Sequence, residues 1–173
     1  MKRVGVTTAL HVVEDTRSAK VGHLHGTVLR QDAISDSCFI HLPEPPSDVG
    51  FTQVKIMRGI APRPNSGAWF KGSISSSDGN PTHTMILATD VFVPHLVENM
   101  QLRIYTSRDA QLGDSGAALV TEDGVAGFAF HRTKHGELPA MCSWIWAHSV
   151  VKALEIEEMD LSIGTIKARK GSV

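Results

Sequence analysis

Hydrophobic and polar residues alternate in short runs along most of the chain, and residues that favour turns separate these runs. Short alternating runs of this kind are typical of antiparallel strands in a β-barrel or β-sandwich. Two clear turn signals are DGNP at residues 78–81 and EDG at residues 122–124. The pattern predicts strands at residues 3–9, 20–30, 36–42, 53–59, 68–75, 82–91, 101–106, 116–120, 124–131 and 141–146.

Helical spacing is confined to one late stretch. Between residues 148 and 157, the apolar side chains of Val150, Val151, Leu154 and Ile156 fall broadly on one side of a helix. The chain is therefore predicted to be all-β with a C-terminal helix. Residues 161–168 could add an edge strand.

A proline-rich segment divides the strand pattern. PEPPSDVG, at residues 43–50, cannot donate a regular ladder of hydrogen bonds, and we interpret it as a connector. It predicts a partial N-terminal lobe at residues 1–50, a second lobe with the helix at residues 51–157, and a tail at residues 158–173.

Composition narrows the classes of partner. The 173 residues are 42% hydrophobic, which suffices for one domain or for two small lobes that share a core. The net charge of −1 offers no basic surface for nucleic acid or for an anionic membrane. No apolar window approaches the roughly 18 residues of a membrane span. We therefore expect neither nucleic acid nor a membrane as a partner.

The cysteines and the N-terminus bear on the compartment. Cys38 and Cys142 both lie in apolar runs, whereas secreted domains of this size commonly carry several disulfides. We interpret both as buried thiols in separate lobes. The apolar run near the N-terminus contains polar residues and is followed by Glu14 and Asp15 rather than by a signal-peptide cleavage site. These features predict a cytoplasmic location.

The most distinctive stretch is LGDSGAALV, at residues 112–120. Ser115 stands between Asp114 and Gly116, in a sequence that predicts a tight turn before a strand. The backbone amides of Gly113 and Ser115 could point at an oxyanion that develops on a reacting carbonyl. The alternative is an ordinary glycine turn between two strands.

A nucleophilic serine needs an oriented base. Histidine is suited to take the serine proton, and a carboxylate on its other ring nitrogen would orient it. His11 in TTALHVV and Asp36 in DSCFIHL are the candidates, with Asp32 as a rival for Asp36. His23 and His25 lack a third ligand at a recognisable spacing, so we predict no metal site.

These three motifs, in the order histidine, aspartate, serine, resemble those of the trypsin-like serine proteases. TTALHVV is similar to the threonine-alanine-alanine-histidine motif of that family, and DSCFIHL to its aspartate motif. GDSG matches the serine motif, and the segments GVAGFAFHR and CSWIWAHSVVKAL resemble the family's last two strands and terminal helix.

The resemblance implies two packed antiparallel β-barrels with the site between them, and a peptide or protein substrate cleaved without a cofactor. Ser115 would attack, His11 would transfer the proton, Asp36 would orient His11, and the Gly113 and Ser115 amides would bind the oxyanion. Asp109, six residues before Ser115, occupies the position that in the trypsin branch recognises lysine or arginine.

Two departures from the family pattern leave alternatives open. The sequence has only ten residues before His11, so the first barrel is predicted to be incomplete. Residues 161–168, a second chain or an upstream segment could complete it. Arg132 stands where the family keeps a small glycine, and it could block the pocket or pair with Asp109. The alternative function is a catalytically inactive protease-fold module that binds a peptide or a partner protein.

Overall fold

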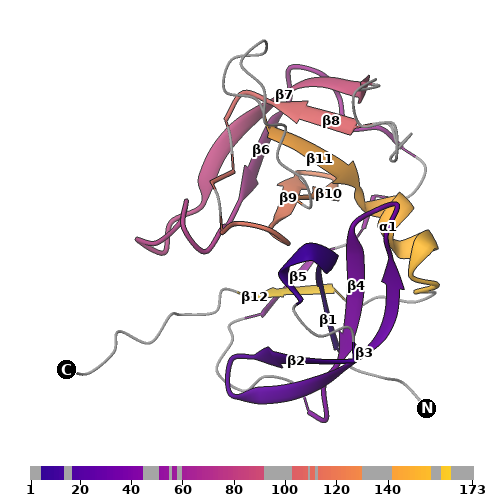
Figure 1. The fold of residues 1–173 in the computed structure, drawn as a ribbon. Coiled ribbons are helices and arrows are strands. Elements are labelled where there is room, and N and C mark those ends of the chain that lie inside the picture. Colours follow the sequence, from indigo (N-terminus) through magenta and orange to yellow (C-terminus); the bar gives the residue numbers. More distant parts are fainter. Residues whose placement is uncertain are drawn as a thin grey trace.

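Two antiparallel β-sheets, one of four strands and one of six, form the framework of the computed structural model (Figure 1). The described residues are 5–13, 17–44, 51–54, 56–57, 60–91, 103–108, 110–111, 113–129, 142–156 and 161–164.

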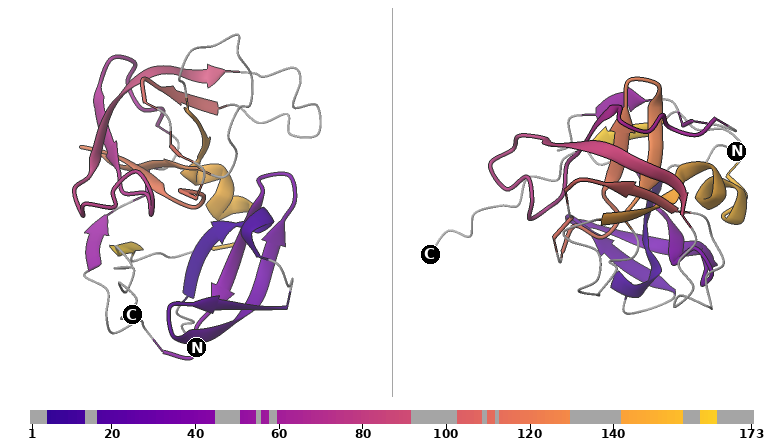
Figure 2. Two further views of the ribbon diagram at one scale, coloured as in Figure 1. Left: turned by 60° about the vertical axis from the view of Figure 1, so that its left-hand side comes forward. Right: turned by 90° about the horizontal axis from the view of Figure 1, so that it is seen from above.

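The first sheet has four strands in the order β1-β4-β3-β2. These strands are β1 (Gly5–Ala9), β2 (Ser18–Val21), β3 (Leu24–Asp32) and β4 (Ser37–His41). Among the described residues this sheet is curled without closing into a barrel (Figure 2). The predicted incomplete first barrel is therefore confirmed.

The second sheet is a closed barrel of six strands in the order β10-β11-β8-β7-β6-β9. Its strands are β6 (Gly67–Phe70), β7 (Thr82–Val91), β8 (Arg103–Thr106), β9 (Ala118–Thr121), β10 (Gly124–Phe128) and β11 (Cys142–Trp146). The helix α1 (Ala147–Ala153) follows β11 directly. The predicted fold class, mostly strands with one C-terminal helix, is confirmed.

Residues from both sheets share one apolar cluster, which holds the sheets against each other. Ala9 of β1 and Phe39 of β4 pack with barrel residues such as Val120 and with Val150 of α1. The helix lies beside the junction of the two sheets (Figures 1 and 2). Burial of these side chains favours one fixed arrangement of the sheets, and it places the end of β1 next to the barrel.

The predicted strand at residues 20–30 is wrong, because this stretch is a hairpin of β2 and β3. Val21 pairs with Leu24, and Gly22 turns the chain with a φ of +62°. Glycine adopts this conformation without steric cost. The apolar alternation continues across the turn, so periodicity alone did not mark it.

Two other strand predictions were too long or shifted. The strand predicted at residues 68–75 ends at Phe70, and the one predicted at 53–59 corresponds to β5 (Phe51–Val54). β5 pairs with β12 (Leu161–Gly164), so the tail does form a strand, in a two-stranded sheet separate from β1–β4. The proposed connector at 43–50 lies outside the described residues from position 45 onward. No helix among the described residues has the length and apolar character needed to cross a membrane.

Candidate active site

His11 lies in a short 3-10 turn, η1 (Leu10–Val12), that begins where β1 ends. Two backbone groups of this turn bind Asp36. The Leu10 amide donates to the Asp36 carbonyl at 2.8 Å, and the His11 amide donates to Asp36 Oδ1 at 3.0 Å. The turn is therefore fixed to the residue that also contacts the histidine ring.

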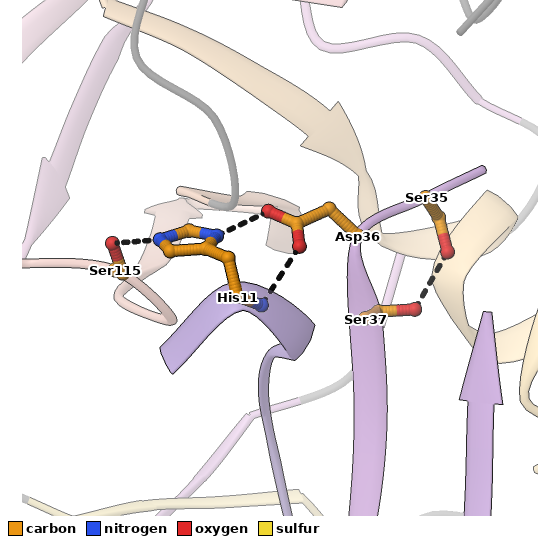
Figure 3. Close-up of polar contacts among 5 residues, drawn as sticks. All are labelled: His11, Ser35, Asp36, Ser37 and Ser115. Carbon is orange, nitrogen blue, oxygen red and sulfur yellow. Dashed lines mark hydrogen bonds and ion pairs between the residues drawn. The ribbon is translucent and has the colours of Figure 1, made fainter. Parts of the chain in front are cut away.

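Asp36 is the last residue before β4 and has a left-handed backbone, with a φ of +48°. Its Oδ2 lies 2.5 Å from His11 Nδ1 (Figure 3). The Asp36 side chain is 14% exposed and that of His11 is 49% exposed. The carboxylate is thus largely shielded from water, whereas the imidazole is open to solvent, as a proton-transfer group acting on a substrate must be.

Ser115 comes from the barrel and meets His11 across the junction of the sheets. Ser115 Oγ lies 3.1 Å from His11 Nε2. The serine stands in a turn, residues 113–116, in which Gly113 and Gly116 have φ values of +103° and +92°. Side chains other than glycine rarely adopt such angles, so the two glycines allow the turn that presents the serine.

The buried carboxylate of Asp114 anchors this turn through hydrogen bonds. Asp114 is 1% exposed, and its oxygens accept hydrogen bonds from the amides of Ile74, Ser75 and Gln111 at 2.7, 3.1 and 2.8 Å. The Ser75 hydroxyl is a fourth donor. A buried carboxylate is costly unless it is hydrogen-bonded, and three of these four donors hold the serine turn against residues 74 and 75.

Backbone amides on either side of Asp114 are available to a ligand. In the described part of the chain, neither the Gly113 amide nor the Ser115 amide donates to a protein acceptor. The neighbouring amides of Asp114 and Gly116 donate to the carbonyls of Gln111 and Ala129. Two backbone donors beside a serine hydroxyl are suited to bind a developing negative charge.

The structure brings together three of the predicted site residues, His11, Asp36 and Ser115. The rival Asp32 instead binds the amide and the hydroxyl of Ser35. Asp109, the predicted pocket residue, lies outside the described residues, as does Arg132. Within the described residues no group of three or more possible metal ligands occurs.

Some residues that position the site were not predicted from the sequence. The anchoring role of Asp114 and its partner Ser75 was missed, as was the pair of buried serines that flanks Asp36 (Figure 3). The GDSG motif drew attention to Asp114 only as a neighbour of Ser115. No local signal distinguishes Ser75 from its neighbouring serines, because its contact depends on a loop 39 residues away.

Comparisons with known proteins identify the fold. None of the protein-family models matches the chain, and no curated protein matches it by sequence. Solved structures do match, and they are chymotrypsin-fold serine proteases.

Three of these structures come from named bacteria. Cellulomonas bogoriensis chymotrypsin is 17% identical, with a TM-score of 0.64 over 91% of this chain and 86% of that chain. Thermobifida fusca protease A is 15% identical, with a TM-score of 0.62 over 87% and 82%. Nocardiopsis protease is also 15% identical, with a TM-score of 0.61 over 88% and 84%. At these identities the likeness shows the fold, and the chain has the chymotrypsin fold.

Proposed function

We propose that this protein is a serine endopeptidase that hydrolyses peptide bonds through an acyl-enzyme intermediate on Ser115. The observation that carries the proposal is the double contact of the His11 ring, with Asp36 at 2.5 Å and with Ser115 at 3.1 Å. A serine hydroxyl is a weak nucleophile until a base takes its proton. The chymotrypsin fold supports the same proposal.

The acylation step follows from the order of these contacts. In the tautomer with its proton on Nδ1, His11 donates to Asp36 and its Nε2 accepts the Ser115 proton. Ser115 Oγ then bonds to the substrate carbonyl carbon, and the Gly113 and Ser115 amides stabilise the oxyanion. The peptide C–N bond breaks as His11 Nε2 transfers the proton taken from Ser115 to the leaving amine.

The second half of the reaction uses the same groups. Water donates a proton to His11 Nε2 and its oxygen attacks the acyl carbon. The ester bond to Ser115 Oγ breaks, and the proton returns from Nε2 to the serine. The products are a carboxylic acid and the regenerated hydroxyl, so the cycle needs no cofactor.

Labelling with a fluorophosphonate tests the proposal. The reagent phosphonylates activated serines, and intact-protein mass spectrometry detects the adduct. We expect one adduct on the parent protein and none on the Ser115→Ala or His11→Ala variants. Ser66→Ala is a matched control, because Ser66 is a half-buried turn serine of the barrel lobe whose hydroxyl donates to the Arg63 carbonyl.

The absence of an adduct on a folded parent would contradict the peptidase proposal. It would favour the alternative of an inactive module that binds a peptide or partner protein. The observation that supports this alternative is the open first sheet, whose four described strands do not close into a barrel. An adduct that persists in His11→Ala would contradict the role of His11 as the base.

Cleavage after lysine or arginine is the specificity that we propose from Asp109. A carboxylate at a pocket floor favours a cationic partner, because an unpaired buried charge is costly. We expect fluorogenic peptides with Lys or Arg before the scissile bond to be cleaved faster than peptides with Phe or Glu there. Asp109→Asn should abolish this preference and retain fluorophosphonate labelling, whereas an unchanged preference would exclude Asp109 from the pocket.

A further inference from the structure

The residues behind Asp36 form a hydrogen-bonded cluster of their own. Asp32 ends β3 and Ser37 begins β4, and the two are paired across the strands. Residues 33–36 connect them. Within this connection the Ser35 amide and the Ser35 hydroxyl both donate to Asp32 Oδ2, at 2.6 and 2.5 Å.

A second serine extends the cluster. Ser35 Oγ and Ser37 Oγ lie 2.6 Å apart. The single Ser35 hydroxyl proton is directed to Asp32, so the Ser37 hydroxyl is the donor to Ser35 Oγ. The order of donation is therefore Ser37 to Ser35 to Asp32. Ser35 and Ser37 are both fully buried, at 0% exposure.

The cluster lies on both sides of Asp36, the residue of the connection whose carboxylate is hydrogen-bonded to His11. Asp36 stands between the two serines in sequence, and Figure 3 shows the Ser35–Ser37 contact on the side of Asp36 away from His11. Asp36 also has a left-handed backbone, with a φ of +48°. Aspartate tolerates this region better than most residues, but it is still less favourable than the ordinary backbone regions, so contacts on either side help to hold it.

We infer that Asp32, Ser35 and Ser37 are positioning residues that hold Asp36 in this conformation and so direct its carboxylate at His11. Buried hydroxyl bonds are stiff in a medium of low dielectric constant, and breaking one leaves its partner unsatisfied. Without them the connection would relax toward ordinary backbone angles, and Oδ2 would move away from Nδ1. The positioning of Asp36 does not depend on the proposed function, but the effect of this positioning on the reaction rate does.

Proton NMR of the His11 ring tests the positioning directly. A histidine Nδ1–H bonded to a carboxylate gives a far-downfield resonance, which ¹⁵N-labelled histidine assigns and which a His11→Ala sample identifies. We expect this resonance to broaden or disappear in Ser35→Ala and to persist in Ser66→Ala, which removes a hydroxyl bond of 2.6 Å in the other lobe. Ser35→Thr, which keeps the hydroxyl, should restore it.

The rate of fluorophosphonate labelling supplies the catalytic readout. A displacement near 1 Å can cost about a hundredfold in rate, and we expect roughly a tenfold loss in Ser35→Ala from a smaller displacement. If the cluster acts through Asp36, Ser35→Ala should cause no further loss in an Asp36→Ala background. General loosening of the fold would lower the rate equally in both backgrounds and would overturn the inference.

The remaining outcomes separate the two proposals. An unchanged Nδ1–H resonance in folded Ser35→Ala would overturn the positioning role, whatever the parent's activity. If the parent protein shows the resonance but forms no adduct, the result would contradict the peptidase proposal. The NMR comparison of the parent with Ser35→Ala would then decide the positioning role. If Ser35→Ala does not fold, Ser37→Ala replaces it, because that variant leaves the Ser35–Asp32 bonds in place.

Discussion

At the scale of single residues, the candidate site depends on three carboxylates that differ in what they contact. Asp36 faces the His11 ring, Asp32 holds the connection behind Asp36, and Asp114 anchors the serine turn from the barrel side. Asp36 and Asp114 accept hydrogen bonds from distant parts of the chain, whereas Asp32 accepts two from Ser35 in its own connection. The carboxylates therefore determine where the reactive groups lie, and only one of them touches the histidine.

Replacement of Asp114 tests the anchoring of the serine turn. In Asp114→Asn, the new amide group would face N–H donors of Ile74, Ser75 or Gln111 instead of accepting from them. The Gly113 and Ser115 amides should then shift, and loss of one oxyanion donor typically costs about 10²–10³ in rate. We expect a loss in fluorophosphonate labelling of that order.

The matched control for Asp114 is Asp123, an exposed aspartate between β9 and β10. Asp123→Asn should retain both the labelling rate and the urea midpoint of the parent. Parental labelling in Asp114→Asn would show that the turn keeps its shape without the buried carboxylate. Ser75→Ala removes only one of the four donors and should have a smaller effect.

At the scale of elements, the close approach of neighbouring strands limits what the sequence can vary. In β10, a Cβ atom on Gly127 would lie 2.7 Å from the Ile145 carbonyl and 3.0 Å from Trp144 Cβ. In β6, a Cβ atom on Gly67 would meet nothing within 4 Å. The same residue type is therefore required by packing in one barrel strand and free to change in another.

These two glycines give a paired prediction about stability. Gly127→Ala should lower the free energy of unfolding by about 1–3 kcal/mol, because the added methyl group overpacks the contact between β10 and β11. Gly67→Ala should be neutral or slightly stabilising, since alanine reduces the freedom of the unfolded chain. Urea denaturation measures both, and equal effects of the two substitutions would contradict the packing argument.

At the scale of the whole molecule, the apolar cluster between the two sheets also holds together the two halves of the candidate site. Ala9 lies in that cluster, two residues before His11, and the cluster also includes Val120 of β9, the strand that follows Ser115. The first sheet also has a core of its own, which contains the buried Cys38, a free thiol. Global stability should therefore respond to the state of that thiol.

Cys38 makes the stability of the molecule dependent on alkaline pH. Burial raises the pKa of its thiol from an ordinary 9.0 to about 11; a hydrogen bond with the Thr8 backbone opposes the shift, and the negative charge of Asp36 adds to it. Between these values the unfolded chain releases the proton and the folded chain keeps it. The contribution to stability is thus fully present below pH 9 and is lost as the pH rises through 11.

Urea unfolding from pH 8 to 11 measures this dependence against Cys38→Ala. The substitution lowers the whole curve through lost packing, but it removes the thiol's share of the alkaline slope. We expect the parent to lose stability with rising pH more steeply than the variant. Parallel curves would mean that the Cys38 thiol titrates alike in the folded and unfolded chains.

By itself, the sequence determined the fold class and proposed the members of the site, because both depend on local chemistry. Alternation of apolar residues specifies strands. Gly113 and Gly116 favour a turn around Ser115, and this preference does not depend on which residue the serine contacts. The sequence could not show that residues 20–30 form a hairpin, since apolar alternation has the same period on both sides of the turn at Gly22.

Only the tertiary structure decided which groups meet. Asp32 and Asp36 are both aspartates close to β4, and the sequence alone does not show which of them contacts His11. In the structure, the left-handed backbone of Asp36 directs its carboxylate at His11, while Asp32 binds Ser35. Ser115 reaches His11 from 104 residues away because burial of a shared apolar cluster fixes one sheet against the other. Contacts between residues so far apart in the sequence arise from packing of the whole chain, and a local sequence pattern cannot predict them.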